Sequence, residues 1–260
     1  MTHLKLEVAD AVATVTLNRP EVRNAFNDEV IVELTQAIRD LGGRDDVRCI
    51  ILAAAGTAFC AGADLNWMKR MADYTREQNL ADAAQLGEML RTIDQCPKPT
   101  IARVQGDVYA GGTGLVATCD IAVAVDTANF CLSETRIGLI PATISPYVVR
   151  AMGARAAHRW FLTAERFSAA EAQRIGFVHE VVTPEQLDAK VAELAKTLVT
   201  CGPAAVKATK KLLHDVAGTD ITPELIGMTV EAIADVRVST EGREGLQSFL
   251  QKRKPGWLLA

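Results

Sequence analysis

The pattern of apolar residues changes near residue 185, and this change limits the folds open to the chain. Before it, short apolar segments with strand character alternate with stretches of helical periodicity. We predict strands at Val12–Leu17, Arg48–Ala54, Thr100–Val104, Ile121–Val125 and Val178–Val182, and helices at Asp28–Leu41 and Leu65–Met71. Strands that alternate with helices indicate an α/β fold built from successive strand–helix units.

Beyond residue 185 only helical patterns remain. Four helices are predicted, and three of them open with proline, which suits the first helical turn. They lie at Pro184–Val199, Pro203–Val216, Pro223–Val236 and Thr240–Lys252. Because no further sheet is left to cover, their apolar faces are expected to pack on the preceding domain or on another chain. We therefore predict a core domain, residues 1–200, and a C-terminal helical region, residues 201–260, that serves oligomerisation.

Charge and hydropathy argue against two classes of partner. The 28 basic and 32 acidic residues give a net charge of −4, without the broad positive field that draws proteins onto nucleic acid. The longest strictly apolar stretch is seven residues, at Cys49–Ala55, whereas a membrane helix needs about 20. The N-terminus has neither a signal core nor transit-peptide character. We expect no nucleic-acid partner, no membrane partner and a cytoplasmic location.

The six cysteines lie far apart, without a CxxC pair and without a histidine at zinc-ligand spacing. No metal site is expected. We interpret the cysteines as reduced thiols that are mostly buried, at Cys49, Cys60, Cys96, Cys119, Cys131 and Cys201.

Two segments of small residues, 58–65 (AFCAGADL) and 105–115 (QGDVYAGGTGL), each follow an apolar strand and run into a helix. Small residues let a ligand approach the backbone, and a helix start leaves N–H groups unpaired, which suits a polarised or anionic oxygen. A tight turn explains the first segment equally well on its own, and close helix packing explains the second. Two such segments together favour an oxyanion hole made of backbone N–H groups.

A third segment, 131–141 (CLSETRIGLIP), places a carboxylate and a guanidinium inside apolar sequence. A carboxyl group in apolar surroundings has a raised pKa, which suits it to proton transfer near neutral pH. Two other interpretations of Glu134 stay open, an acid at a helix N-terminus and an ion-pair partner of Arg136. Glu134 is the main candidate for a catalytic group.

In this order and spacing, the three segments resemble the enoyl-CoA hydratase/isomerase (crotonase) superfamily. The early motifs Leu17–Pro20 and Arg23–Phe26 and the later Gly176–Glu180 extend the resemblance over nearly the whole chain. It implies an α/β, crotonase-like spiral of strand–strand–helix units with a C-terminal helical trimerisation region. It also implies a homo-trimer or a dimer of trimers, an acyl-CoA substrate and no separate cofactor, since coenzyme A is part of the substrate.

The resemblance also assigns site residues. The backbone N–H groups of Ala63 and Gly111 would hold the thioester oxygen and stabilise the enolate. Further substrate contacts are implied at Ala61, Asp64, Leu65, Arg23, Phe249 and Lys252. The last two would reach the CoA of a neighbouring subunit, although Lys252 also fits an exposed basic tail and Phe249 a core position.

The family's hydratases usually carry two glutamates, whereas this chain has only one of them. The position of the first is Gly114, and the second matches Glu134. We therefore predict a hydratase that works with a single glutamate, in which Glu134 orients water and delivers the α-proton.

Segments 66–71 (NWMKRM), 134–136 (ETR) and 140–147 (IPATISPY) look most like the methylglutaconyl-CoA hydratases of leucine breakdown. Close relatives act on isohexenylglutaconyl-CoA in acyclic terpene breakdown. Both substrates carry a second carboxylate, which favours an Arg or Lys partner. The candidates are Lys69, Arg70 and Arg136, although Lys69 and Arg70 also fit an exposed helix face.

Other activities use the same fold, because fold does not fix function. An enoyl-CoA isomerase, a thioester hydrolase and a decarboxylase stay open. So does a non-catalytic relative that binds acyl-CoA or RNA, although Glu134 argues against the loss of catalysis and the acidic charge against RNA.

Overall fold

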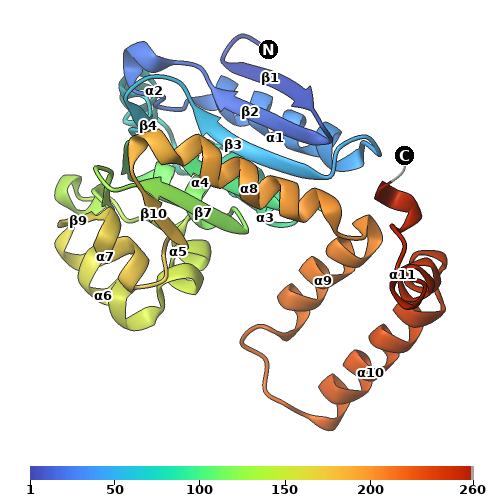
Figure 1. The fold of residues 1–260 in the computed structure, drawn as a ribbon. Coiled ribbons are helices and arrows are strands. Elements are labelled where there is room, and N and C mark those ends of the chain that lie inside the picture. The colour runs from blue at the N-terminus through green and yellow to red at the C-terminus, as the bar shows by residue number, and fades with distance from the viewer. Residues whose placement is uncertain (259–260) are drawn as a thin grey trace.

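The computed structural model describes residues 1–258, and its framework is a six-stranded sheet with the strand order β1-β2-β3-β5-β7-β10 (Figure 1). Strands β2, β3, β5, β7 and β10 run parallel, whereas β1 forms an antiparallel hairpin with β2. The bounds are β1 (Leu4–Ala9), β2 (Val12–Leu17), β3 (Cys49–Ala54), β5 (Thr100–Val104), β7 (Ile121–Val125) and β10 (Glu180–Val182).

A second sheet has four strands of three residues each, in the order β4-β6-β8-β9. They are β4 (Ala58–Cys60), β6 (Asp107–Tyr109), β8 (Asn129–Cys131) and β9 (Arg166–Ser168). Strands β4, β6 and β8 follow β3, β5 and β7 directly, so each turn of the chain adds one strand to each sheet before a helix begins. This arrangement confirms the predicted α/β spiral of strand–strand–helix units.

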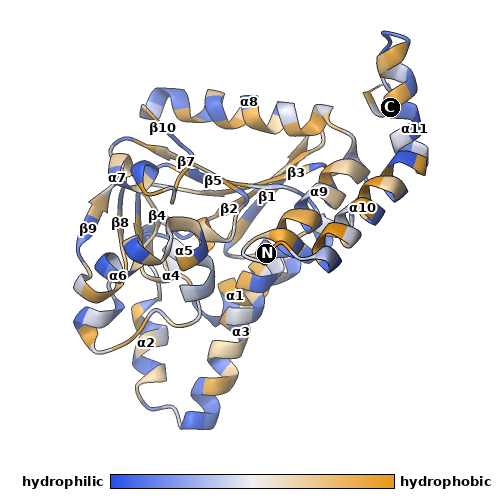
Figure 2. Cartoon of the chain, turned by 90° about the horizontal axis from the view of Figure 1, so that it is seen from below, coloured by the Kyte–Doolittle hydropathy of each residue, from blue (hydrophilic) through white to orange (hydrophobic). Residues whose placement is uncertain are grey.

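Helices cover both faces of the large sheet (Figure 2). Helix α8 (Leu187–Thr200) lies along one face, with contacts to β3, β5 and β7, and buries Leu187, Val191 and Ala195. The other helices of the core are α1 (Asp28–Gly43), α2 (Leu65–Met71), α3 (Arg76–Asp94), α4 (Gly111–Ala117), α5 (Ser145–Met152), α6 (Ala154–Thr163) and α7 (Ala169–Arg174). Short 3-10 turns lie at η1 (Pro20–Val22), η2 (Glu134–Ile137), η3 (Pro184–Gln186) and η4 (Gly256–Leu258).

Strand β3 shows why the large sheet forms where the sequence predicted it. It lies between β2 and β5, and every one of its residues is buried. A parallel strand that is covered on both faces needs apolar side chains on both, which explains its unbroken apolar run. The five cysteines that precede Cys201 are buried, Cys201 is exposed, and all six are free thiols, as predicted.

Helix α9 (Pro203–Val216) follows α8, and α10 (Pro223–Val238) and α11 (Thr240–Leu250) stand away from the sheets (Figure 1). No residue of α10 is buried, and Ile226, Val230 and Ile233 form an apolar row on it with about half of each side chain exposed. None of the helices within residues 1–258 is long and apolar enough to cross a membrane. The division at residue 200 coincides with the end of α8, and the role of the tail in oligomerisation stays a prediction.

An ion pair between a buried lysine and a partly exposed aspartate ties the tail to the core. Lys210 of α9 is 7% exposed, and its Nζ donates to Asp120 Oδ2 at 2.7 Å and to the Lys98 carbonyl at 3.3 Å. The same carboxylate oxygen accepts from the backbone N–H and the hydroxyl of Thr100. Asp120 and Thr100 precede and begin neighbouring strands, so this contact fixes α9 against the large sheet.

Lys210→Met is expected to lower the free energy of unfolding by about 1.5–3 kcal/mol, because the partly exposed Asp120 loses a hydrogen bond from a charged group. Urea denaturation measures the change. Lys211→Met is the matched control: Lys211 pairs with Asp215 on the exposed face of the same helix, and its loss is expected to cost about 0.5 kcal/mol or less. Equal losses in the two variants would contradict this account of the tail.

Candidate active site

The two glycine segments meet at one edge of the small sheet. Strands β4 and β6 pair in parallel, so the loops that follow them leave at the same edge. A Cβ placed on Gly62 would lie 2.9 Å from Ala110 Cβ and 3.7 Å from the Gly111 nitrogen. Gly62 has a φ of +89°, which also favours glycine. The two segments therefore meet, as an oxyanion hole built from both of them requires.

Ala63 presents a free backbone N–H beside this contact. Residues Phe26 and Ala63 form a parallel β-bridge. In it, Phe26 N donates to the Gly62 carbonyl and Asp64 N donates to the Phe26 carbonyl, both at 2.9 Å. Because successive residues of an extended segment direct their N–H groups to opposite sides, the N–H of Ala63 faces away from Phe26. It has no acceptor within residues 1–258.

Gly111 supplies the second free N–H, as the first residue of α4. The first N–H groups of a helix have no partner inside it. A Cβ on Gly111 would lie 2.4 Å from Cζ of the buried Phe26, so only glycine fits without a shift of that ring. Phe26 thus packs against both donor segments. That Ala63 and Gly111 bind a thioester oxygen is a proposal that this geometry supports.

Glu134 lies at the same edge of the small sheet. Strand β8 pairs in parallel with β6, and the Ala110 N–H donates to the Cys131 carbonyl at 2.8 Å. Glu134 then begins η2. Its Oε2 atom is buried without a hydrogen-bond partner in the described chain, and burial raises the pKa of the carboxyl above its usual value. No ion pair joins Glu134 to Arg136 within residues 1–258.

The position of the absent glutamate is closed by apolar atoms. A Cβ on Gly114 would lie 2.3 Å from Ile144 Cγ2 and 3.3 Å from Leu90 Cδ2. Ile144 and Leu90 are themselves buried in the core. The chain therefore has no space at Gly114 for a second carboxylate. Of the two expected glutamates, it has only Glu134.

The predicted substrate contacts around the first loop have different surroundings. The N–H of Ala61 donates to the Arg23 carbonyl at 3.0 Å, so the exposed Arg23 adjoins this loop. Leu65 is 74% exposed. The Asp64 side chain is buried and accepts from Arg19 and from the N-terminus of α2, so its carboxylate is held inside the protein. A contact between Asp64 and substrate stays a prediction.

Of the two arginines predicted to bind a substrate carboxylate, one already forms an ion pair and the other does not. Arg70 donates to Asp28 Oδ1 at 2.7 Å, which links α2 to the start of α1. Arg136 is exposed, lies two residues after Glu134 and has no ion-pair partner in the part of the chain that the structure describes. A contact of either arginine with a substrate carboxylate stays a prediction.

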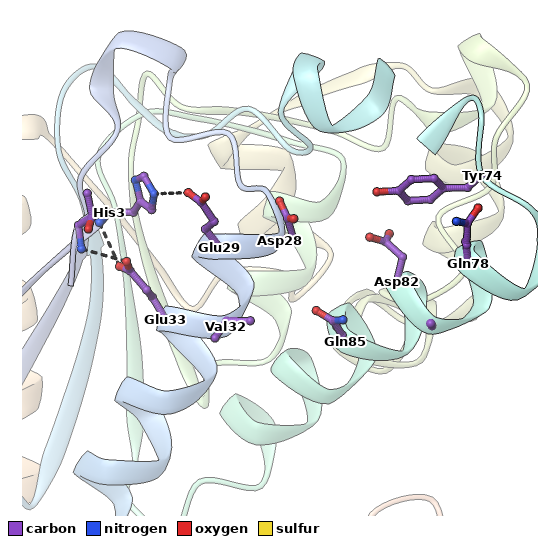
Figure 3. Close-up of a pocket in the computed structure, with 11 residues that line it drawn as sticks. His3, Asp28, Glu29, Val32, Glu33, Tyr74, Gln78, Asp82 and Gln85 are labelled. Carbon is purple, nitrogen blue, oxygen red and sulfur yellow. Dashed lines mark hydrogen bonds and ion pairs between the residues drawn. The ribbon is translucent and has the colours of Figure 1, made fainter. Parts of the chain in front are cut away.

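Asp28 lines a groove of about 920 Å³ between α1 and α3, together with Glu29, Glu33, Tyr74 and Asp82 (Figure 3). Glu33 accepts the backbone N–H groups of Thr2 and His3, and His3 contacts Glu29. None of Ala63, Gly111 and Glu134 lines this groove. Its acidic walls do not suit the phosphates of an acyl-CoA.

The two predicted tail residues, Phe249 and Lys252, lie on or next to helix α11. Phe249 is 80% exposed on α11, which contacts α9 and α10, and Lys252 is exposed just beyond that helix. The alternative of a core position for Phe249 is therefore wrong. A contact of Phe249 and Lys252 with the CoA of another subunit stays a prediction.

Comparison with known proteins gives one family. The enoyl-CoA hydratase/isomerase family matches residues 7–258. The short-chain-enoyl-CoA hydratase of Clostridium acetobutylicum is 31% identical over 260 residues, which cover 98% of this chain and 97% of the relative. An enoyl-CoA hydratase structure from Shewanella pealeana has a TM-score of 0.96 at 42% identity and covers 98% of this chain and 96% of its own. One from Mycobacterium smegmatis has a TM-score of 0.92 at 34% identity and covers 98% and 99%.

These matches span the sheets, the candidate site and the helical tail. The chain therefore belongs to the enoyl-CoA hydratase/isomerase (crotonase) superfamily of enzymes, which act on acyl-CoA thioesters.

Proposed function

We propose that the protein is a hydratase that adds water across the α,β double bond of an enoyl-CoA thioester. One observation carries the proposal: within residues 1–258, the buried Oε2 atom of Glu134 has no hydrogen-bond partner, and it lies at the sheet edge where Ala63 and Gly111 present free N–H groups. A group that moves protons and donors that stabilise an oxyanion are the two parts that such an addition needs.

The chemistry follows from these groups. The Glu134 carboxylate takes a proton from water as the water oxygen bonds to the β-carbon. The electrons of the double bond move toward the thioester, and the N–H groups of Ala63 and Gly111 stabilise the negative charge on its oxygen. The protonated Glu134 then gives its proton to the α-carbon and returns to the carboxylate form. Coenzyme A enters as part of the substrate, and the addition needs no other cofactor.

For the substrate we propose 3-methylglutaconyl-CoA, an intermediate of leucine degradation that bears a free carboxylate. The exposed, unpaired guanidinium of Arg136 near Glu134 supports this choice. A second candidate is isohexenylglutaconyl-CoA, which adds a branched apolar tail. It is favoured by the exposed apolar side chains of Ile137, Leu139 and Ile140, which follow Glu134 directly.

Arg136→Gln is expected to lower kcat/KM for 3-methylglutaconyl-CoA by about 10-fold or more, since a hydrogen bond to a charged group is worth about 1.5–3 kcal/mol. Activity on crotonyl-CoA, which lacks the second carboxylate, is expected to stay unchanged. Loss of the conjugated enoyl absorbance measures turnover. Arg155→Gln is the matched control, because Arg155 is also exposed but lies on α6. Equal losses on both substrates would exclude Arg136 as the carboxylate partner.

Product masses separate the alternative activities in the same assay. Hydration adds the mass of one water, isomerisation leaves the mass unchanged, and thioester hydrolysis releases free coenzyme A. Binding of the thioester without turnover would favour a non-catalytic relative. Hydration of neither thioester by the wild-type protein would reject the proposed function.

We further propose a trimer or a dimer of trimers in the cytoplasm. The apolar row on α10 supports association, because a single chain leaves it exposed. In such an assembly Phe249 and Lys252 reach the CoA of a neighbouring subunit, and Arg23 binds CoA phosphate within its own subunit.

A further inference from the structure

We propose that Arg19 is a positioning residue that fixes the direction of the Ala63 N–H through contacts on both sides of the Phe26–Ala63 bridge. The inference rests on the proposed oxyanion hole and adds a residue that does not touch the substrate. The Arg19 side chain is 15% exposed and its partner Asp64 7% exposed, so the pair lies inside the protein.

The guanidinium of Arg19 clamps the two strands of that bridge. Its Nη1 donates to the Ala25 carbonyl at 2.6 Å, and its Nη2 donates to Asp64 Oδ2 at 2.8 Å. Ala25 immediately precedes Phe26, and Asp64 immediately follows Ala63. One planar group thus bonds the backbone of Ala25 and the side chain of Asp64, the neighbours of the two bridge residues, and its fixed geometry limits their separation.

Asp64 extends this clamp to helix α2. Its Oδ1 accepts from Asn66 N at 2.8 Å and from Trp67 N at 3.4 Å, as the N-cap of the helix. Burial alone would raise the pKa of Asp64, but the hydrogen bonds from Asn66 and Arg19 hold it below the usual value. The carboxylate is therefore ionised wherever the enzyme works, and the ion pair with Arg19 persists.

Asn24 fixes the other end of Arg19. The Arg19 backbone N–H donates to Asn24 Oδ1 at 3.0 Å. The Asn24 amide donates in turn to the carbonyls of Ala55 and Ala58, at 2.7 and 2.8 Å, and Asn24 is 2% exposed. The base of Arg19 is thus tied to the turn between β3 and β4, and its side chain starts from a rigid point.

This arrangement matters because Ala63 has no acceptor among residues 1–258 that would orient its own N–H. The direction of that N–H depends on Gly62 and Asp64, whose bonds to Phe26 and Arg19 define the loop. A misplacement of about 1 Å in a catalytic group can cost about 100-fold in rate. Because the thioester oxygen carries more charge in the transition state than in the bound substrate, the loss is expected in kcat rather than in KM.

The test compares Arg19→Met and Arg19→Lys with wild type on crotonyl-CoA. Arg19→Met is expected to lower kcat by about 100-fold with KM within about threefold. Arg19→Lys keeps the charge and is expected to recover part of the loss. Arg44→Met is the control, because it removes a short but exposed pair with Asp46.

The second readout is the binding of acetoacetyl-CoA, which forms an enolate when hydrogen-bond donors stabilise its oxygen. The near-ultraviolet band of this enolate is expected with wild type. With Arg19→Met the thioester is expected to bind without the band.

Wild-type kcat and a wild-type enolate band in Arg19→Met would overturn the inference. Should Arg19→Met fail to fold, Asp64→Asn removes the charge that Arg19 binds and keeps an oxygen for the N-cap, so it tests the same clamp with the same two readouts. A KM increase without change in kcat or in the band, in either folded variant, also rejects a positioning role. If wild type itself shows neither turnover nor an enolate band, the proposed function fails, and that result is distinct from failure of the clamp.

Discussion

Glu134→Gln is expected to lower kcat on an enoyl-CoA thioester by about 100-fold to 10,000-fold, the usual contribution of a positioned acid–base group. Glutamine keeps the size of the side chain but can neither take a proton from water nor return one to the α-carbon. KM is expected to change little, because the N–H groups of Ala63 and Gly111 stay in place. Steady-state kinetics and product masses measure the effect.

The matched control is Glu185→Gln, which also neutralises a glutamate in the first turn of a 3-10 helix but at an exposed position. It is expected to leave kcat unchanged. Turnover that survives in Glu134→Gln would move the chemistry to another group. A loss shared by both variants would point to a general effect of charge.

Because the pKa of Glu134 is raised, the effect of Glu134→Gln on stability can be distinguished from its effect on activity. A carboxyl whose pKa is higher in the folded than in the unfolded state contributes stability below the unfolded pKa and loses it as pH rises through the folded pKa. Above the raised pKa the ionised Glu134 therefore costs stability, and Glu134→Gln is expected to melt no lower than wild type there. Wild-type kcat/KM is expected to rise with pH through the same pKa, as the carboxylate forms.

Several long elements of the fold can be predicted from the sequence because each carries a full period of apolar residues. Helix α3, with 19 residues, cannot, since its buried residues all lie near its C-terminal end. The helix predicted at Asp28–Leu41 ends at Gly43, and the one predicted at Pro184–Val199 begins as the turn η3 before α8. The strands of the small sheet were not predicted, because three residues are too few to show alternation. Strand β1 was missed as well, since most of its side chains are exposed.

The candidate site was predictable where its groups are local in sequence and not where they depend on distant contacts. Gly62 and Gly111 can be identified because they lie in segments of small residues, and Glu134 because it is an acid in an apolar segment. Nothing in the sequence pairs Arg19 with Asp64, because the contact forms only when the first loop folds against the Phe26 segment. The positioning role that we propose for Arg19 therefore cannot be predicted from the sequence, although Arg19 lies in the motif Leu17–Pro20.

Gly114→Glu is expected to lower the free energy of unfolding by about 3 kcal/mol, close to the upper end for an overpacked core. The new Cβ would lie 2.3 Å from Ile144 Cγ2, and the carboxyl group would enter apolar surroundings. Urea denaturation measures the loss. Gly87→Glu is the matched control: Gly87 is also a helical glycine, but a Cβ there meets no atom within 4 Å, and the substitution is expected to be neutral or stabilising.

A double-mutant cycle identifies Ile144 as the group that excludes the second carboxylate. Ile144→Ala alone is expected to cost about 2–4 kcal/mol through the cavity that it leaves. In Gly114→Glu/Ile144→Ala the new side chain fills part of that cavity, so the combined loss is expected to fall short of the sum by at least about 1 kcal/mol. Strict additivity, or equal stability of Gly114→Glu and Gly87→Glu, would show that Gly114 has room for a side chain. The packing around Gly114 would then not exclude a second glutamate, and the site would have one glutamate only because the residue at position 114 is glycine.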